Sequence, residues 1–205
     1  MHIVDGALAN PVVIGGALVA AGGIALGLRH LPLERIPAAG VLSAAFFVAS
    51  LVHVPIGPSS VHLILNGLAG LMLGWAAFPA LFVGLLLQAV FFGFGGLTVL
   101  GVNTVNIALP AVIVHYLCRP GVTRASAPVA AIWAGVGGAL SIALTTALVA
   151  GALRLSGEQF IPAAKLVFFA HIPVMVIEGL LAAAAVYLIR QVKPDLFDSL
   201  KGAPA

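Results

Sequence analysis

The sequence predicts an all-α integral membrane protein with about seven transmembrane helices, and three observations lead to this class. Of the 205 residues, 62% are hydrophobic and only 7% are charged, far outside the composition of soluble domains. Apolar stretches long enough to cross a bilayer as helices follow one another along most of the chain. The basic residues stand singly near the ends of these stretches, as orientation signals do. We therefore expect one transmembrane domain over residues 1–205.

Seven spans are predicted, each separated from the next by proline, glycine or charged residues. They cover residues 11–28, 36–52, 61–77, 79–98, 103–118, 127–151 and 166–190. Small residues recur four apart in several of them, for example at Gly70 and Gly74. This spacing lets transmembrane helices pack closely, within the bundle or against another membrane subunit.

The basic residues also predict the orientation. If the N-terminus lies outside, seven of them fall on the cytoplasmic side: Arg29, Arg35, Arg119, Arg124, Arg190, Lys193 and Lys201. Only Arg154 and Lys165 then lie outside, which satisfies the positive-inside rule. An odd number of spans also places the C-terminus in the cytoplasm. Because the charges are scattered, the net charge of +3 does not indicate a nucleic-acid partner. We expect a multi-pass protein of the bacterial cytoplasmic (inner) membrane.

The first two residues have the chemistry to bind a transition metal. No signal sequence precedes the first span, and His2 is too bulky for removal of the initiator methionine, so we expect Met1 to keep a free α-amine. This amine, the backbone amide of residue 2 and the His2 imidazole can hold one ion through three nitrogens in a plane. Planar nitrogen sites suit Ni²⁺ or Cu²⁺, with Co²⁺ below nickel in affinity, whereas Mg²⁺ and Ca²⁺ prefer oxygen. The single cysteine, Cys118, cannot build a thiolate cage.

His62 is the predicted remaining ligand of this metal segment, residues 1–10. It follows the polar residues 57–60 at the outer end of the third span, on the same side as the N-terminus. His53, at the same boundary, is the competing ligand. Polar residues within a membrane bundle are costly and face its interior or a cavity. We expect several of them to orient the imidazoles or to line an access path, namely Asp5, Ser60, Asn66, Gln88 and Asn103.

Two features allow more than one interpretation. Asp5 either hydrogen-bonds the nitrogens of the N-terminus or caps the first helix. His171 and Glu178 stand seven residues apart on one face of the last span. They form either a structural hydrogen-bonded pair or a functional coupling pair, because an intramembrane carboxylate commonly serves a function.

Four ordered blocks of the sequence match one known family. They are residues 1–6 (Met-His-Ile-Val-Asp-Gly), residues 57–62 (Gly-Pro-Ser-Ser-Val-His) with Asn-Gly-Leu at 66–68, residues 95–103 (Gly-Gly-Leu-Thr-Val-Leu-Gly-Val-Asn), and His-Ile-Pro at 171–173 with Glu-Gly at 178–179. In these blocks the chain resembles the cobalt and nickel substrate-capture subunits of energy-coupling factor (ECF) transporters, the CbiM and NikM family. The resemblance implies a seven-span fold with the N-terminal segment tucked into the bundle. It also implies a square-planar metal site made by Met1, His2 and His62.

The same resemblance implies the cargo and the partners. The transported substrate would be Ni²⁺ or Co²⁺, and Val4 and Asp5, where cobalt members usually have methionine and glutamate, leave the choice open. The partners would be a coupling transmembrane subunit, ATPase subunits and a small accessory membrane subunit. The sequence contains no P-loop motif. We therefore expect no nucleotide on this chain and no enzymatic activity, with ATP hydrolysed on separate subunits.

Three other functions compete with this interpretation. A secondary carrier that works alone would show the same spans and the same metal site. An intramembrane hydrolase would pair Ser60 or Ser141 with His62 or His171, but the sequence has neither a Gly-x-Ser-x-Gly nor a His-Glu-x-x-His element. A haem-carrying electron-transfer subunit would use two histidines as axial ligands.

Overall fold

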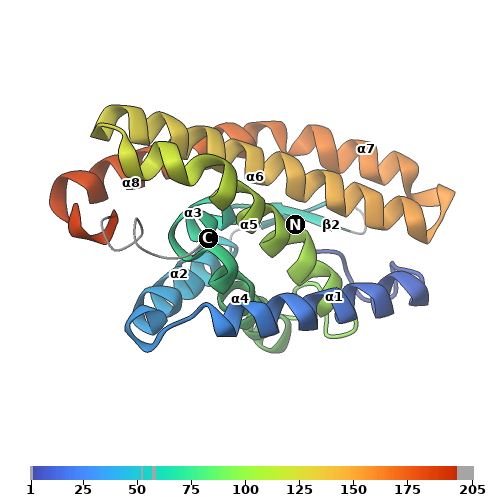
Figure 1. The fold of residues 1–205 in the computed structure, drawn as a ribbon. Helices are drawn as coiled ribbons and strands as arrows, with labels where there is room; N and C mark the ends of the chain where they lie inside the picture. Colours follow the sequence, from blue (N-terminus) through green and yellow to red (C-terminus); the bar gives the residue numbers. More distant parts are fainter. Residues whose placement is uncertain (1, 52, 57–58, 198–205) are drawn as a thin grey trace.

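The structure, a computed structural model, describes residues 2–51, 53–56 and 59–197, with the backbone alone for residues 54–56, 59 and 60. It is built almost entirely from helices, which confirms the predicted class (Figure 1). The helices are α1 (Asn10–Arg29), α2 (Ile36–Ala49), α3 (Asn66–Leu73), α4 (Ala77–Phe92), α5 (Leu100–Arg124), α6 (Ala127–Ser156), α7 (Ile161–Ala170) and α8 (Ile172–Val192). Short 3₁₀ turns cover Leu33–Arg35, Gly74–Ala76 and Glu158–Phe160. Five helices carry a proline as their second residue, where its missing N–H costs nothing, at Pro11, Pro37, Pro128, Pro162 and Pro173.

The helices form layers that run between two ends of the molecule. In Figure 1, α6, α7 and α8 form the upper layer, α1, α2 and α4 the lower layer, and α3 and α5 lie between them. We call the end at which α1, α3 and α5 begin the histidine end, because His2 and His62 lie there. The opposite end, where α1 and α3 finish, is the arginine end, defined by Arg29, Arg35 and Arg119. Hydrogen bonds from Ile3 to Asn103 and from Ala9 to Ser156 join the N-terminal segment to α5 and α6 at the histidine end.

The chain departs from the predicted spans around residues 53–77. The predicted second span, 36–52, is the 14-residue helix α2, and Pro55 prevents its continuation because proline lacks the N–H that a helix needs. Residues His53–Ile56 (β1) and Ser59–His62 (β2) instead pair as an antiparallel hairpin in which His53 faces His62. The predicted third span, 61–77, therefore starts late, at Asn66. The hairpin is an addition that the sequence patterns did not predict.

Helix α3 lies parallel to α5 and in close contact with it. Three contacts share one register: Asn66 donates to the carbonyl of Ile107, Gly70 faces Ala111, and Gly74 faces the ring of His115. A Cβ on Gly70 would overlap the Ala111 carbonyl, so only glycine permits this approach. Gly74, at φ 59°, then reverses the chain into α4. The small-residue spacing noted in the sequence therefore serves packing within the bundle.

Five helical stretches of the described chain are long and apolar enough to cross a membrane. They are Asn10–Arg29, Asn66–Phe92, Leu100–Arg124, Ala127–Ser156 and Glu158–Val192. The second of these reverses at Gly74, and α2 at 14 residues is shorter than the roughly 20 residues that a bilayer core needs. The exact number of crossings stays a prediction, although the chain runs seven times between the two ends.

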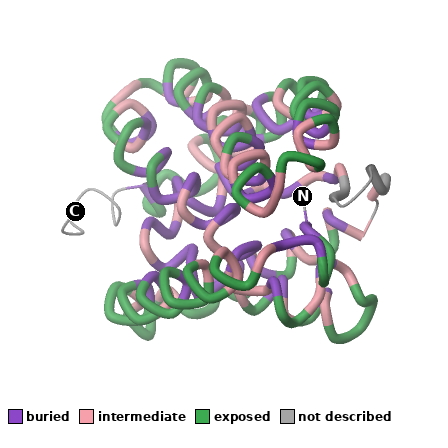
Figure 2. Tube along the Cα trace, turned by 90° about the vertical axis from the view of Figure 1, so that its right-hand side faces the viewer, coloured by how far each residue is buried: buried purple, intermediate pink, exposed green. Residues whose placement is uncertain are grey.

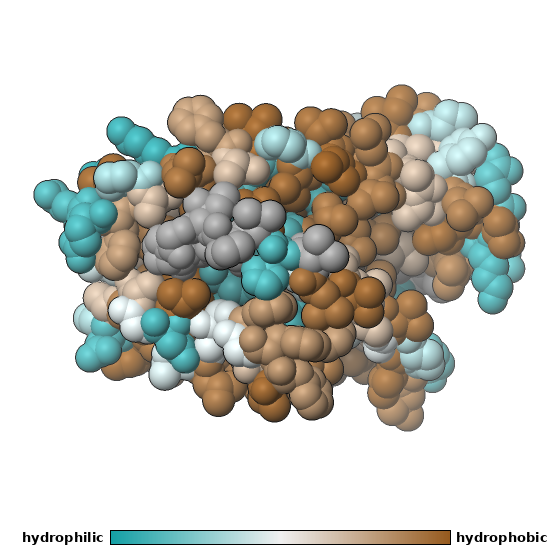
Figure 3. All heavy atoms as spheres, turned by 180° about the vertical axis from the view of Figure 1, so that it is seen from behind, coloured by the Kyte–Doolittle hydropathy of each residue, from teal (hydrophilic) through white to brown (hydrophobic). Residues whose placement is uncertain are grey.

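The surface has the polarity of a membrane protein. Buried residues gather on the inner faces of the helices and exposed residues on their outer faces (Figure 2). Many exposed side chains are large and apolar, among them Leu18 (70% exposed), Phe91 (68%) and Leu180 (67%). Hydrophobic side chains cover much of the face in Figure 3, and hydrophilic ones gather mainly toward its two ends. Such apolar outer faces suit contact with lipid.

The basic side chains are unevenly divided between the two ends. Six that were expected on one side lie at or near the arginine end, by their positions in the helices: Arg29, Arg35, Arg119, Arg124, Arg190 and Lys193. Arg154 and Lys165 belong to elements at the histidine end, and Lys201 lies outside the described residues. This division fits the predicted orientation. Which end faces the cytoplasm stays a prediction.

Candidate metal site

The structure brings His2 and His62 together in the interior. Their rings are stacked, with centroids 4.5 Å apart and planes inclined by 19°, and each residue is only 3% exposed. Burial lowers the pKa of both imidazoles well below the ordinary range. Both rings are therefore neutral at pH 7, the state in which histidine binds metals. Met1 lies outside the described residues, so the structure gives no position for its amine.

Asn103 holds the segment that carries His2. The side-chain oxygen of Asn103 accepts the N–H of Ile3 at 2.9 Å, and its amide nitrogen donates to the Ile3 carbonyl at 3.0 Å. Ile3 is fully buried, so both of its backbone groups need such partners. This bracket fixes the backbone next to His2 on the first turn of α5. The observed contacts of Asn103 are therefore with the backbone beside His2 rather than with an imidazole.

Asp5 also anchors this segment, but neither predicted role is observed among the described residues. Its carboxylate accepts the backbone N–H of Thr98 at 3.1 Å and the Thr98 hydroxyl at 2.5 Å. Its own N–H donates to the Gly95 carbonyl at 2.9 Å. Asp5 therefore fastens the N-terminal segment to the loop before α5. It caps no end of α1, which has no side-chain cap.

Glu178 holds the segment that carries His62. Its carboxylate, 1% exposed in α8, accepts the N–H of Ile64 at 2.5 Å and that of Leu65 at 2.9 and 3.0 Å. Leu65 adopts φ 55°, which costs energy in a residue with a side chain, and the carboxylate stabilises that turn. His62 Nδ1 lies 2.8 Å from the Leu63 carbonyl and so donates to it. The lone pair of His62 is then on Nε2.

The hydrogen bonds of His171 and Glu178 in the described part of the chain do not join these two residues. Glu178 binds backbone amides, and His171 Nδ1 donates to the Val167 carbonyl at 2.6 Å. The other nitrogen of His171, Nε2, is buried and has no hydrogen-bond partner among the described residues. After burial, the imidazoles of His2 and His171 are among the causes that lower the pKa of His62. His171 therefore lies near the metal candidates.

Gln88 lies beside His2, and its side-chain oxygen could accept a hydrogen bond from the His2 ring. Its amide nitrogen donates to the hydroxyl of Ser50, which in turn donates to the Phe46 carbonyl at 2.8 Å. Two buried atoms, His2 Nε2 and the Gln88 carbonyl oxygen, lack hydrogen-bond partners among the described residues. A hydrogen-bonding contribution from Gln88 acts against the lowering of the His2 pKa, whose main cause is burial. Gln88 can thus receive a proton on Nε2 and leave Nδ1 of His2 for a metal.

The other predicted residues lie in different settings. Asn66 does not reach the imidazoles but joins three helices, donating to Ile107 and Thr145 and accepting from the Ser141 hydroxyl. The ring of His53 lies edge-on against Phe94, with centroids 4.1 Å apart, and so borders the site. The side chain of Ser60 lies outside the described atoms. In the described part of the chain, no three His, Cys, Asp or Glu side chains form a metal cage.

Two residues of this site were missed from the sequence. Ser50, at the end of α2, orients Gln88, and Phe94 lies between the rings of His53 and His2. Ser50 is a lone hydroxyl at the end of an apolar run, and that polarity was the available signal. Nothing in the sequence distinguishes Phe94 from the other ten phenylalanines.

The comparisons with known proteins point to one family. A family model described as the cobalt uptake substrate-specific transmembrane region, CbiM, matches residues 2–196. The chain belongs to the CbiM family. It is 42% identical to a putative metal transport protein of Haemophilus influenzae over 97% of both chains. It is 33% identical to a cobalt transport protein CbiM of Sorangium cellulosum, covering 80% of this chain and 77% of the relative.

More distant relatives agree with this assignment. A putative fused nickel transport protein NikMN of Archaeoglobus fulgidus is 31% identical, over 80% of this chain and 56% of its own length. A crystal structure of a transition metal transporter superposes with a TM-score of 0.72 at 22% identity, covering 94% of this chain and 93% of the other. That likeness concerns the fold alone. This CbiM-family chain is therefore a membrane protein of a transition-metal transport family.

Proposed function

We propose that this protein is the substrate-capture membrane subunit of an ECF-type, ATP-driven importer of Ni²⁺ or Co²⁺. The observation that carries the proposal is the buried, neutral and stacked pair of His2 and His62 at one end of the bundle. A buried pair of this kind has few structural uses, because two imidazoles in contact add little to packing. It is the donor set that a divalent transition metal prefers.

The ion would be held by nitrogens from two separate segments. The N-terminal segment supplies the amine of Met1 with the backbone nitrogen and Nδ1 of His2, and the hairpin supplies Nε2 of His62. For capture, the stacked rings turn until both lone pairs point to one position. Asn103 and Glu178 keep the two backbones in place while this happens.

Release follows from the same two-segment design. A small movement of the N-terminal segment away from β2 separates the ligands and destroys the site. Protonation of the backbone nitrogen and the amine assists, because a metal that displaces protons binds more weakly as the pH falls. ATPase subunits and a coupling membrane subunit would drive this movement, with a small accessory membrane subunit where needed. ATP would be hydrolysed on those partners.

The test is a change at the N-terminus that leaves the fold intact. A peptide tag of several residues placed before Met1 moves the amine out of the chelate, and we expect loss of high-affinity Ni²⁺ and Co²⁺ binding in titration calorimetry. His2→Ala should have the same effect, whereas Leu18→Ala, on the lipid-facing side of α1, should not. Tight binding by the extended protein would refute the chelate.

The stand-alone secondary carrier is the alternative that shares this site. Uptake of radioactive nickel into cells that produce the protein with and without its ATPase partners separates the two. We expect uptake only with the partners. Uptake by the protein alone, driven by the membrane potential, would favour the carrier.

A further inference from the structure

His171 is a buried histidine with one ring nitrogen that the protein does not use. It lies at the junction of α7 and α8 and is 0% exposed. Its Nδ1 lies 2.6 Å from the Val167 carbonyl and donates to it, so the lone pair is on Nε2. This Nε2 is buried and has no hydrogen-bond partner among the described residues. Because a buried polar atom without a partner is costly, it requires an explanation.

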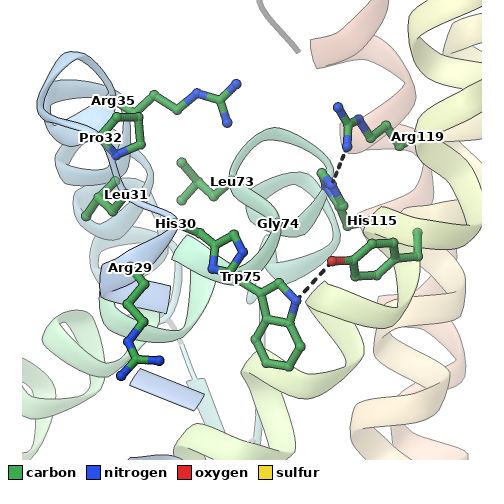
Figure 4. A pocket seen from close by; sticks show the side chains of 11 residues that line it. Arg29, His30, Leu31, Pro32, Arg35, Leu73, Gly74, Trp75, His115 and Arg119 are labelled. Carbon is green, nitrogen blue, oxygen red and sulfur yellow. Dashed lines mark hydrogen bonds between the residues drawn. The ribbon is translucent and has the colours of Figure 1, made fainter. Parts of the chain in front are cut away.

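Another buried histidine, His115, shows how both ring nitrogens can be satisfied within the bundle. Its Nδ1 lies 2.9 Å from the Gly70 carbonyl and donates to it, and its Nε2 lies 3.4 Å from Nη1 of Arg119 (Figure 4). His171 has the first kind of contact but lacks the second. An imidazole that donates one N–H to a backbone carbonyl and keeps a lone pair on its other nitrogen is typical of a metal ligand.

Helix α8 places His171 beside the segment that carries His62. The carboxylate of Glu178 binds the amides of Ile64 and Leu65. His171 lies seven residues before Glu178, which places it about 10 Å away along the helix axis and on the same face. His62 precedes Ile64 by two residues, a chain length of at most about 7 Å. The two histidines therefore lie at a similar depth below the histidine end, where α7 contacts both strands of the hairpin.

His171 stands just outside the stacked pair of His2 and His62. In the described part of the chain the three side chains do not form one metal cage. Burial is the main cause of the lowered His62 pKa, and His171 is close enough to contribute to it. His171 is therefore placed to receive an ion from the pair rather than to join the first chelate.

We propose that His171 and His62 form a second, weaker site for the divalent ion, which the ion occupies when the N-terminal segment withdraws. This inference rests on the proposed metal capture and adds a step to it. His62 keeps the ion while Nε2 of His171 replaces the nitrogens of the N-terminus, so the ion is never without a protein ligand. Two imidazoles, with water at the remaining positions, suit Ni²⁺ or Co²⁺. They hold the ion less tightly than four nitrogens do, which favours its onward release.

The test removes the first site and looks for the second. A histidine-free peptide tag before Met1, combined with His2→Ala, eliminates the chelate, and Co²⁺ titration calorimetry on this full-length protein in detergent measures what remains. We expect one weaker binding site in this background.

His171→Asn, added to the same background, should weaken that site about tenfold or more, since loss even of a residue that only supports a metal ligand costs about 10- to 100-fold. The asparagine amide keeps an N–H donor near the position of Nδ1, so the hydrogen bond to Val167 can remain while Nε2 is lost. Equal Co²⁺ binding with and without His171→Asn would overturn the proposal.

His30→Asn is the matched control. The Nδ1 of His30 lies 2.8 Å from the carbonyl of Leu26, the same contact to the fourth residue before it that His171 makes. His30 is exposed at the arginine end (Figure 4), so its substitution should leave the second site unchanged. His53→Asn tests the other neighbour of His62, across the hairpin. A site that is lost in His53→Asn and kept in His171→Asn would overturn the proposal.

A count of the ligands needs no substitution of His171. Electron spin echo spectroscopy on Cu²⁺ bound to the tagged protein with His2→Ala and His53→Asn should show two imidazoles. A single imidazole would overturn the proposal even if His171→Asn does not fold.

Failure of this inference differs from failure of the proposed function. Tight Co²⁺ binding by the protein with an unmodified N-terminus, without any second site in the tagged His2→Ala protein, would refute the inference alone. A weak site that depends on His171 in both proteins, without tight binding in either, would refute the chelate alone.

Discussion

Removal of the Asn103 side chain should detach the N-terminal segment without unfolding the bundle. Asn103→Ala eliminates the two hydrogen bonds to Ile3, at 2.9 and 3.0 Å, which are long-range links between this segment and α5. A buried hydrogen bond contributes about 1 to 1.5 kcal/mol net, so the docked segment loses about 2 to 3 kcal/mol. If metal binds only to the docked form, the apparent affinity falls in proportion to the docked fraction.

The expected loss can be measured directly. At 1.4 kcal/mol for each factor of ten, 2 to 3 kcal/mol corresponds to about 30- to 140-fold weaker binding once the undocked form dominates. Titration calorimetry with Ni²⁺ on protein with an unmodified N-terminus gives the affinity, and hydrogen exchange at Ile3 reports docking. The matched control is Thr104→Val, which removes one hydrogen bond within α5, from the Thr104 hydroxyl to the Leu100 carbonyl. Equal affinities for Asn103→Ala and Thr104→Val would refute the reasoning.

Three further predictions follow from the buried groups. Glu178→Ala leaves the amides of Ile64 and Leu65 without their acceptor, so we expect at least tenfold weaker metal binding and a lower melting temperature. Glu158→Ala, at an exposed position, should change neither. Gly70→Leu would overlap the Ala111 carbonyl and cost about 3 kcal/mol or more; size-exclusion chromatography should show aggregation, and a well-behaved monodisperse variant would contradict the packing. Because the pKa values of the buried imidazoles are lowered, the unfolded chain binds more protons than the folded chain at acidic pH. The free energy of unfolding of the metal-free protein should therefore be constant above about pH 6.5, the ordinary histidine pKa, and fall as the pH drops below it. The double variant His2→Gln with His62→Gln should lose much of this dependence, and an equal slope in both proteins would contradict the prediction.

The sequence was enough to predict the fold class, the division of basic residues between the two ends of the molecule and the proximity of His2 and His62. Composition and apolar runs indicate a membrane protein directly, because each residue of a lipid-facing helix adds to the hydropathy of its segment. Chemistry limited the choice at the N-terminus, since few sequences combine an amine, an amide and an imidazole in two residues. His62 followed from its position at the same end as His2. The structure brings the two rings to 4.5 Å.

The residues that hold the backbone around the two histidines could not be predicted from the sequence in the same way. Glu178 binds backbone amides 113 and 114 residues away, and every residue except proline offers such an amide, so no sequence pattern marks the partner. The pairing with His171 was inferred from helical spacing, which is local, whereas a polar side chain in a membrane bundle takes the partner that the tertiary fold supplies. Asn66 was assigned to the site for the same reason and instead joins α3, α5 and α6.

The hairpin and the reversal at Gly74 were missed for a different reason. Residues 61–77 are apolar enough for one span, and hydropathy does not detect a change of direction inside an apolar stretch. The pairing of His53 with His62 was missed because hydropathy does not report which strands pair. A pocket lined by Arg29, Arg35 and Arg119 likewise forms only when α1 and α5 pack on the turn after α3.

The coordination of bound nickel tests the account most directly. X-ray absorption spectroscopy on the Ni²⁺-loaded protein with an unmodified N-terminus should show a square-planar shell of nitrogens with imidazole scattering, and less of that scattering in His62→Ala. An oxygen-rich octahedral spectrum, or the same imidazole contribution in His62→Ala, would contradict capture by the N-terminus and His62.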